Sequence, residues 1–154
     1  MGRVSLERVQ EDADERGIGV EFVARPAAGS LEEAAALLGI APAGIVKSLV
    51  VKRSDGTFLF ALIPGDRQIA WPKLRAAVGV NKLQLPSAEA ALEATGYERG
   101  TITPLGSTTA WPVFADERIA GPIAMGAGAH GYSAFVDAAE LLHGLDATIA
   151  DISD

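Results

Sequence analysis

The sequence contains no cysteine, and this absence excludes several classes of site at once. Disulfide bonds, thiolate metal sites and a cysteine nucleophile all need that side chain. The two histidines, His130 and His143, are too few for a zinc site built from histidine alone. We therefore expect no bound metal.

Long hydrophobic runs are missing as well. No segment approaches the roughly 20 apolar residues that span a bilayer. Residues 1–15 are acidic and lack the apolar core of a signal peptide. We expect a cytoplasmic protein that does not enter a membrane.

The common hydrolase and nucleotide-binding motifs are also absent. The sequence has no G-x-S-x-G elbow, no P-loop and no H-E-x-x-H motif. Gly126, Gly128 and Gly131 match G-x-G-x-x-G, but a dinucleotide site needs that loop early in a βαβ unit, and only 23 residues follow Gly131. We expect no cofactor. Two interpretations of this loop stay open, a tight turn and a loop whose backbone amides approach a ligand closely.

Positive charge is scarce overall, since the net charge is −7. Such a chain is a poor nonspecific binder of nucleic acid, and we expect no DNA partner. The charge is unevenly spread, however. Residues 41–100 carry eight basic and five acidic side chains, whereas residues 1–40 carry four and eight, and residues 101–154 carry one and seven. The basic middle is either an ordinary fluctuation or a place that holds a few phosphates.

Helix signals are present at five places in this chain of 154 residues, a length typical of one domain. Residues 6–16 have a polar, helical composition. Ser30 to Glu33 and Asp137 to Glu140 are capping boxes, the first starting a helix that ends at Gly39. Two further short helices are predicted between Pro72 and Gly79 and between Ser87 and Gly96.

Strand signals fall between these helices. Asp55-Gly56 is typical of a two-residue type I′ turn and predicts a hairpin of residues 45–53 and 57–63, with Lys47 opposite Pro64. Further short strands are predicted at 113–114, 119–125 and 147–152. The order lacks a regular βαβ alternation. We therefore predict an α+β fold, a single domain with a curled, mixed and mostly antiparallel sheet flanked by short helices.

Lys47 interrupts the β-branched run of residues 45–51 and is the first candidate functional residue. Because side chains alternate along a strand, it projects with apolar neighbours and either reaches to water or serves a ligand. Ser48, Ser107 and Ser133 lie near the interesting loops, but a serine nucleophile needs a positioned base, and His130 is the one plausible base.

Five segments read together resemble the YbaK family of prolyl-tRNA-synthetase-associated editing domains. They are residues 46–51, residues 63–66, residues 95–97 with 100–106, Asp116-Glu117, and residues 126–128 with Gly131. The similarity runs in order from residue 30 to residue 152. The whole chain is thus expected to form one editing domain, with residues 1–29 a helical N-terminal part outside the clearest resemblance.

The resemblance implies an aminoacyl-tRNA deacylase that hydrolyses the ester of a mischarged tRNA, with tRNA-Pro as the candidate substrate. It implies the tRNA 3′ aminoacyl end as partner, and prolyl-tRNA synthetase as a second candidate partner. Lys47 would anchor the aminoacyl-adenosine end, Gly128 would belong to the catalytic surroundings, and water would attack without a serine or cysteine nucleophile. The substrate-binding residues implied in this way are Ser48, Asp66, Gly100, Pro104, Gly106, Gly126, Ala127, His130, Gly131 and Ser133.

Three departures from the family pattern, at four positions, leave the amino acid open among cysteine, alanine and others. Ser48 stands where threonine is common, Ala127 and His130 differ from the glycine-rich loop of members that clear cysteinyl-tRNA, and Ser133 stands where those members carry an acid. Two other functions remain open, a non-catalytic module that binds a tRNA end or a synthetase, and an esterase for small molecules.

Overall fold

The computed structural model describes residues 2–154 and forms one α+β domain, as predicted. The helices are α1 (Gly2–Arg16), α2 (Leu31–Leu38), α3 (Trp71–Val78), α4 (Ala88–Thr95) and α5 (Ala138–Gly144), with a short 3-10 helix at Pro42–Gly44. The strands are β1 (Val20–Ala24), β2 (Val46–Arg53), β3 (Phe58–Pro64), β4 (Leu83–Gln84), β5 (Val113–Asp116), β6 (Pro122–Gly126), β7 (Tyr132–Asp137) and β8 (Thr148–Ala150).

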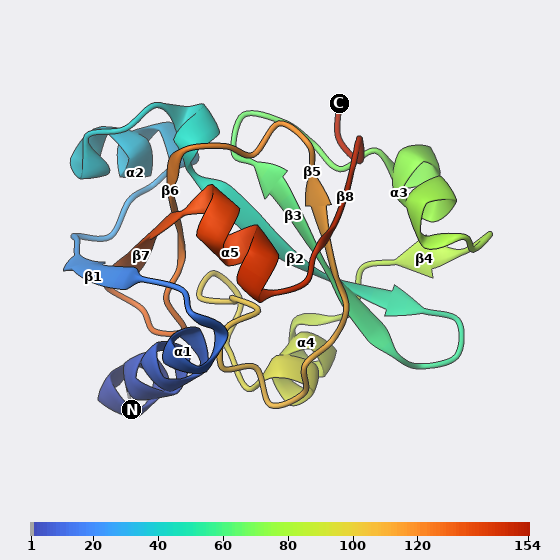
Figure 1. Ribbon diagram of the computed structural model, residues 1–154, viewed down its shortest axis with the longest axis horizontal. Coiled ribbons are helices and arrows are strands. Elements are labelled where there is room, and N and C mark those ends of the chain that lie inside the picture. The colour runs from blue at the N-terminus through green and yellow to red at the C-terminus, as the bar shows by residue number, and fades with distance from the viewer. Residues whose placement is uncertain (1) are drawn as a thin grey trace.

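The strands form two sheets. One has the order β1-β7-β6 and is antiparallel throughout. The other has the order β4-β2-β3-β5-β8, with antiparallel pairs around β2 and parallel pairs on both sides of β5. A parallel bridge between Ile45 and Ala124 joins the two sheets. The mixed sheet predicted from the sequence is therefore divided in two, and β2 begins where the halves meet (Figure 1).

The predicted helix boundaries are confirmed by their caps. Ser30 accepts a hydrogen bond from the Glu33 amide, and Gly39 ends α2 in the left-handed conformation. Asp137 accepts from the Glu140 amide at the start of α5. The reciprocal half of each capping box differs from expectation, because each glutamate accepts from the amide of a glycine outside the box. Glu33 accepts from Gly29, and Glu140 accepts from Gly19 at the start of β1, which ties α5 to that strand.

The predicted hairpin forms, but its register is wrong by one residue. Lys47 pairs with Ile63, and Val46 pairs with Pro64. A type I′ turn needs positive φ at both central residues. Gly56 has φ 85°, whereas Asp146 is the one non-glycine residue of positive φ in the described chain, so Asp55 does not meet this requirement. The chain instead makes a three-residue loop, with Arg53 and Thr57 hydrogen-bonded across it.

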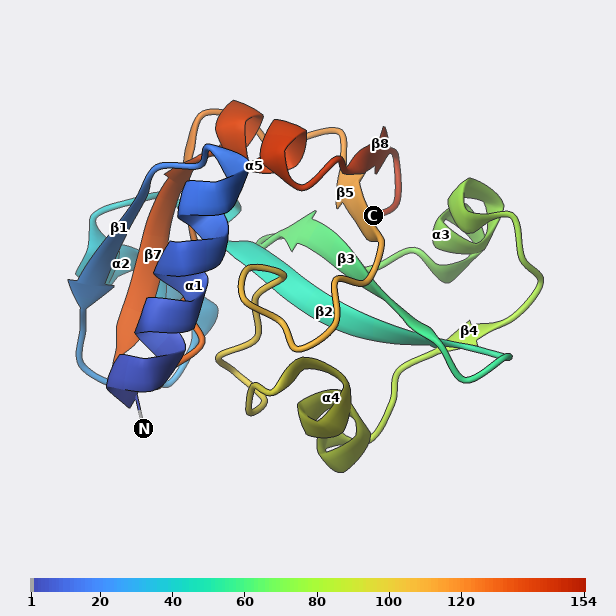
Figure 2. The same ribbon diagram turned by 60° about the horizontal axis from the view of Figure 1, so that its bottom comes forward.

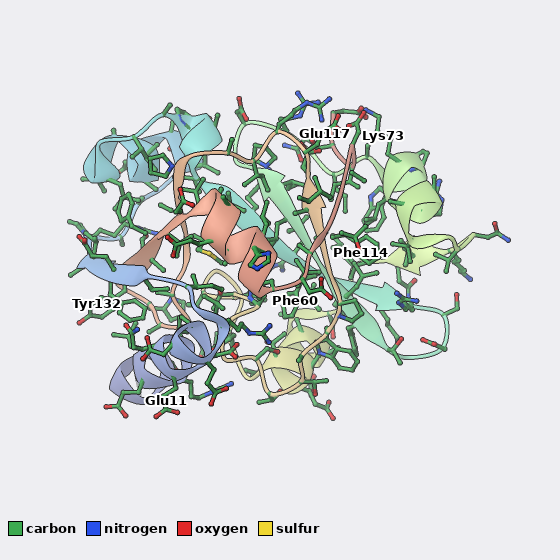
Figure 3. The ribbon with its side chains drawn as sticks, in the orientation of Figure 1. Glu11, Phe60, Lys73, Phe114, Glu117 and Tyr132 are labelled. Carbon is green, nitrogen blue, oxygen red and sulfur yellow. The ribbon has the colours of Figure 1, made fainter. Side chains whose placement is uncertain are left out.

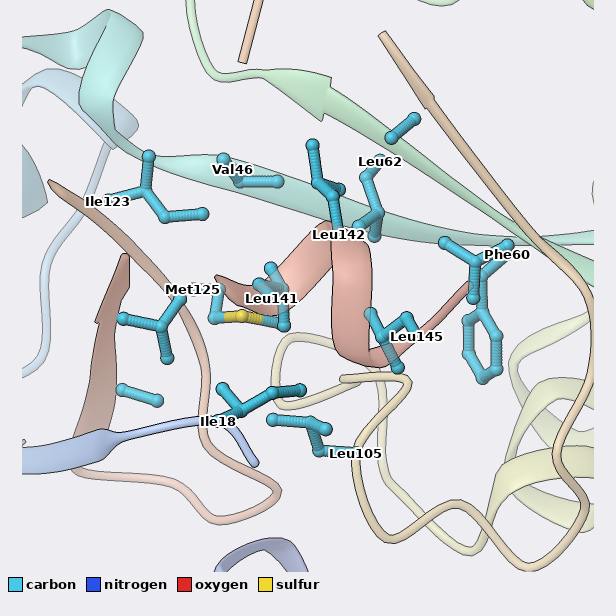
Figure 4. Packing of buried hydrophobic residues seen from close by; sticks show 14 of the residues in the cluster. Ile18, Val46, Phe60, Leu62, Leu105, Ile123, Met125, Leu141, Leu142 and Leu145 are labelled. Carbon is cyan, nitrogen blue, oxygen red and sulfur yellow. The ribbon is translucent and has the colours of Figure 1, made fainter. Parts of the chain in front are cut away.

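The β2–β3 hairpin separates two clusters of buried side chains. Alternate residues such as Val46, Val50 and Phe60 face a large cluster that includes α5 and the β1-β7-β6 sheet (Figure 4). The residues between them, such as Val51 and Leu59, face a smaller cluster with α3. The helix α1 packs on the larger cluster through Val9 and Ala13 and lies along the β1-β7-β6 sheet (Figure 2). Burial on both faces makes β3 the centre of the molecule.

Candidate functional site

A cavity of about 500 Å³ lies at the edge of β2 where the two sheets meet. It opens there because β4 pairs with β2 only at Lys52 and Arg53, which leaves the first part of that edge free. Leu31, Ala34 and Leu38 of α2 form an apolar part of its lining. Its polar lining residues are Arg25, Ser30, Lys47, Ser48, Ser87, Arg99, Tyr132 and Ser133.

Most of the predicted site residues that line this cavity lie on two of its walls. The β2 wall consists of residues 46–50 and presents Lys47 and Ser48. The second wall, called the loop wall, consists of Gly100 and Ile102 from the loop between α4 and β5 and of residues 124–126 at the end of β6. The structure thus brings Lys47 together with parts of both glycine-containing segments, as the sequence predicted, although these segments are far apart in the chain.

Lys47 is half-buried, and its Nζ donates a hydrogen bond to the Arg67 carbonyl oxygen at 2.5 Å. Burial lowers the pKa of Lys47, and the nearby Asp66 carboxylate opposes part of this shift. An ammonium group has three donors. Lys47 therefore keeps two donors for a ligand while its position is fixed from the turn that follows β3.

Ser48 contributes a hydroxyl without a partner. Its Oγ is buried and makes no hydrogen bond to any described residue, although it belongs to the cavity lining. A buried hydroxyl without a partner costs free energy in the empty protein. A ligand group that bonds to Ser48 would recover that cost, which makes the hydroxyl a candidate contact.

The loop wall depends on close backbone packing. A Cβ added at Gly126 would collide with the Ile102 carbonyl oxygen and lie 3.0 Å from that of Thr101. Gly128 has φ 81°, its amide donates to the Thr101 carbonyl at 2.8 Å, and an added Cβ would lie 2.7 Å from Cε1 of Tyr97. Gly128 is outside the cavity lining and its amide is already paired. Its position is therefore explained by packing of the two loops against each other.

Pro104 and Gly106 lie elsewhere, in a second depression beside α1. The Gly106 carbonyl accepts from the Arg8 guanidinium, at 2.5 Å from Nη2, and the Gly106 amide donates to Asp12 at 2.8 Å. Arg8 also covers the ring of Tyr97 at 4.8 Å. Of the predicted segment 100–106, the first residues therefore shape the cavity, and the last are held by the N-terminal helix.

Four other predicted contacts also lie outside the lining. Asp66 is exposed near Lys47. His130 is exposed, and its Nε2 lies 3.0 Å from the Glu98 carboxylate. The Gly131 carbonyl accepts from the Arg25 amide, and Ala127 is buried in the large cluster. Ser133 does line the cavity, where its Oγ accepts from Nε of Arg25 at 3.0 Å.

Sequence reasoning missed Arg25, Arg99 and Tyr132 as cavity residues. Arg25 and Tyr132 come together through the pairing of β1 with β7, and no spacing along the chain signals that pairing. Tyr132 is partly exposed and is labelled below β1 in Figure 3. With Lys47, the cavity has three cationic side chains, and none of its described lining residues is acidic. The site is suited to an anionic ligand.

Two absences concern the described residues 2–154 alone. No group of three or more His, Asp or Glu side chains is placed to hold a metal ion. No helix in this range is long and apolar enough to cross a membrane.

Comparison with known proteins identifies the family. The model of the aminoacyl-tRNA editing domain matches residues 25–143. The chain belongs to this family. Every lining residue of the cavity lies inside the matched segment, which begins at Arg25. The first 24 residues and the last 11, which include α1 and β8, lie outside it.

Individual relatives agree with this assignment. The chain is 39% identical over 105 residues to the proline–tRNA ligase of Thermosipho africanus and 34% identical over 116 residues to that of Bacillus licheniformis. It spans about a fifth of these ligases, 18% and 20% of their lengths. A solved structure of a protein proposed to be a trans-editing enzyme for prolyl tRNA synthetase superimposes with a TM-score of 0.88 at 29% identity, covering 97% of both chains. A second, the hypothetical protein APE2540, gives a TM-score of 0.87 at 26% identity, covering 96% of this chain and 99% of that one.

Proposed function

We propose that this editing domain is an aminoacyl-tRNA deacylase that acts in trans, on tRNA mischarged by a separate synthetase. The observation that carries the proposal is a cavity with cationic and no acidic side chains among its described lining residues, to which β2 contributes the consecutive residues Lys47 and Ser48. The terminal nucleotides of a tRNA bring phosphates, and the aminoacyl ester brings a carbonyl whose oxygen becomes negative during hydrolysis. Both features match a cationic cavity.

The reaction needs positioning more than a protein nucleophile. Water adds to the ester carbonyl carbon, the bond to the ribose oxygen breaks, and that oxygen leaves with a proton as the tRNA hydroxyl. Lys47 acts as an electrostatic anchor for the aminoacyl-adenosine end and the developing oxyanion. In this proposed reaction, the neighbouring ribose hydroxyl of the substrate activates the water.

A serine mechanism has less support. Both histidines lie outside the described cavity lining, and His130 is paired with Glu98 at the surface. Ser133 accepts from the Arg25 guanidinium, a group that cannot take a proton from a serine hydroxyl. An activated serine needs a base within hydrogen-bond reach. We therefore assign Ser133 to holding Arg25 at the cavity.

Arg25, Arg99 and Tyr132 extend the proposal to the nucleotide. The two arginines provide charge for phosphates of the 3′ end, and a partly exposed tyrosine ring can stack on a base. Two phosphate contacts correspond to a slope of about −1.4 in log affinity against log salt, at about −0.7 per single-stranded contact. We expect weak, salt-sensitive binding, with tRNA-Pro carrying a wrong amino acid as the first substrate to examine.

The test is a panel of mischarged tRNAs, including alanyl- and cysteinyl-tRNA-Pro, incubated with wild-type protein and with Lys47→Ala. We expect turnover by the wild type and a loss of about 10²- to 10³-fold in Lys47→Ala, the cost of a lost oxyanion donor. Lys52→Ala is the matched control, because Lys52 lies on the same strand outside the cavity.

Each alternative has its own outcome in this panel. Binding without turnover identifies a tRNA-binding module, and comparable turnover of aminoacyl esters that lack tRNA identifies a small-molecule esterase. A folded Lys47→Ala protein with normal turnover removes Lys47 from the mechanism.

A further inference from the structure

The position of Lys47 depends on a turn that follows β3. The acceptor that the described residues provide for its Nζ is the carbonyl oxygen of Arg67. This contact is made by the backbone of Arg67, so it survives any change of that side chain as long as the turn stays in place. What holds the turn therefore determines where the ammonium group lies.

The turn is held by the C-terminal segment, residues 152–154. Gln68 and Asp154 exchange two backbone hydrogen bonds, with N–O distances of 3.0 and 2.8 Å. The Ala70 amide donates to the Ile152 carbonyl at 2.9 Å. These bonds form a short antiparallel pairing between segments that are more than 80 residues apart. The C-terminal segment lies outside the segment matched by the editing-domain model.

The Arg67 side chain strengthens this pairing. Its Nε donates to Ser153 Oγ at 2.8 Å, and its Nη2 donates to the Ser153 carbonyl at 3.1 Å. Two parallel donors from one planar group fix an orientation as well as a distance. Arg67 thus points its guanidinium at the C-terminal segment and its carbonyl at Lys47.

A buried carboxylate anchors the other side of Ser153. Asp116, at the end of β5, has no exposed surface and neither has Ser153. Ser153 Oγ donates to Asp116 Oδ2 at 2.7 Å, and the Ile152 amide donates to the same oxygen at 3.1 Å. The hydroxyl therefore acts both as acceptor from Arg67 and as donor to Asp116. A buried network whose members are all paired is rigid.

We propose that Arg67, Ser153 and Asp116 are positioning residues for Lys47, acting through the carbonyl of Arg67. The consequence for turnover rests on the deacylase function proposed above. The exposed rim of this region, where Lys73 and Arg118 pair with Asp151, adds little, because ion pairs in water contribute weakly. Lys73 is labelled near the C-terminal end of the chain in Figure 3. The hydrogen bonds from Asp116 through Ser153 to Arg67 are the part that determines the position of Lys47.

The experiment uses Arg67→Ala, which removes the guanidinium and keeps the backbone carbonyl. Arg75→Ala is the matched control, since Arg75 is half-buried on α3 and its side chain makes no hydrogen bond within the described chain. In deacylation of mischarged tRNA we expect kcat to fall about 10- to 100-fold in Arg67→Ala, because a displacement of about 1 Å at the reacting group costs about that much. KM should change less, and Arg67→Lys, which restores one donor, should recover part of the rate.

A second readout does not need activity. The sequence has four lysines, so the side-chain NMR signals of lysine-labelled protein can be assigned with Lys47→Arg. We expect Arg67→Ala to shift the signal and the titration of Lys47 while Lys52 and Lys82 keep theirs, and Arg75→Ala to leave Lys47 unchanged; Lys73 is not a reference, because it donates to the Ser153 carbonyl of the same C-terminal segment. A purely structural role for the network would lower stability without either effect.

The outcomes separate the two proposals. A wild-type protein that hydrolyses no mischarged tRNA overturns the proposed function. An active wild type with an equally active Arg67→Ala overturns the positioning role alone, whether or not the Lys47 signal moves. A Lys47 signal that stays at its wild-type position in folded Arg67→Ala overturns it as well.

Discussion

The β2 wall of the cavity presents side chains on a strand, whereas the loop wall depends on close contacts of glycine with neighbouring backbone. On β2, Lys47 and Ser48 project from the part of the strand that pairs with β3 alone. In the loop wall, Gly126 packs against the carbonyl oxygens of Thr101 and Ile102, and Gly128 just beyond it packs against the Tyr97 ring. A side chain on β2 can thus be exchanged with the backbone in place. A side chain added at Gly126 or Gly128 instead forces the Ile102 carbonyl or the Tyr97 ring to move.

This difference determines what a loss of activity means. In the β2 wall, a folded variant without turnover reports on the chemistry of the missing group. At Gly126 and Gly128, a substitution should reduce turnover and disturb the fold together, so activity alone cannot assign a role to Gly128. The sharpest tests therefore compare variants that share one property and differ in a single contact.

The largest expected effect is a difference in stability between alanine variants of two glycines that have nearly the same φ. Gly128 and Gly131 have φ 81° and 84°, but an added Cβ would lie 2.7 Å from Tyr97 at Gly128 and would meet nothing within 4 Å at Gly131. Positive φ costs roughly 1–2 kcal/mol for a non-glycine residue, and overpacking adds about 1–3 kcal/mol. We expect Gly128→Ala to lower the free energy of unfolding by roughly 2–5 kcal/mol and Gly131→Ala by about 1–2 kcal/mol, measured by urea denaturation. Equal losses would show that the Tyr97 contact relaxes freely. Gly128→Val should be worse than Gly128→Ala.

A smaller effect on stability is expected at Asp116, the buried carboxylate that holds Ser153. Burial by itself raises the pKa of Asp116, but hydrogen bonds from Ser153, Arg118 and the Ile152 amide together hold it below the usual value of 3.8. The ionised carboxylate therefore stabilises the folded protein above about pH 4, and this contribution is lost as the pH falls through the folded pKa. We expect Asp116→Asn to cost roughly 1.5–3 kcal/mol at pH 7, the range for hydrogen bonds to a charged group.

The pH dependence provides the check on Asp116. The stability difference between wild type and Asp116→Asn should shrink as the pH is lowered from 5 to 2 in denaturation experiments. Asp151→Asn serves as control, because Asp151 makes exposed ion pairs with Arg118 and Lys73, and it should change stability little at pH 7. A difference for Asp116→Asn that stays constant with pH would assign its effect to packing.

The smallest effect compares two serines whose buried hydroxyls lack partners in the described structure, Ser48 and Ser107. Removing such a hydroxyl leaves no partner unpaired, so both alanine variants should match the wild-type stability to within about 1 kcal/mol. Ser48 lines the cavity and Ser107 does not. We expect Ser48→Ala to lower kcat/KM roughly 3- to 10-fold, the equivalent of one neutral hydrogen bond, and Ser107→Ala to leave it unchanged. Equal activity of the two variants would remove Ser48 from substrate contact.

Local signals in the sequence predicted most elements of the fold. The caps at Ser30, Ser87 and Asp137 and the left-handed glycines 39, 79 and 96 mark the helices because each acts within four residues. The strand β1 was missed, since Gly17 and Gly19 on its N-terminal side favour a break and its five residues lack a clear alternation. The predicted hairpin register was wrong because the conformation of Asp55 decides whether the loop has two or three residues. An Asp-Gly pattern does not fix that conformation.

The site residues on the strand and loops named by the resemblance could be predicted. Those that reach the cavity through pairing of distant strands could not. Lys47, Ser48, Gly100, Gly126 and Ser133 meet at the cavity as expected. The missed residues Arg25 and Tyr132 reach it through β1–β7 pairing. Gly106 instead meets Arg8 and Asp12 of α1. Such contacts join residues about 90 to 110 positions apart, beyond any local pattern.

The burial of β3 has a consequence for how the site is lost on heating. This strand is hydrogen-bonded to β2 on one edge and to β5 on the other, and residues 59–63 have no exposed surface. Amides in such a strand exchange with solvent through unfolding of the whole domain. Lys47 pairs directly with Ile63 of this strand. The β2 wall should therefore have no premelting of its own, and the half-life of the proposed deacylase activity at high temperature should equal the half-life of the folded chain.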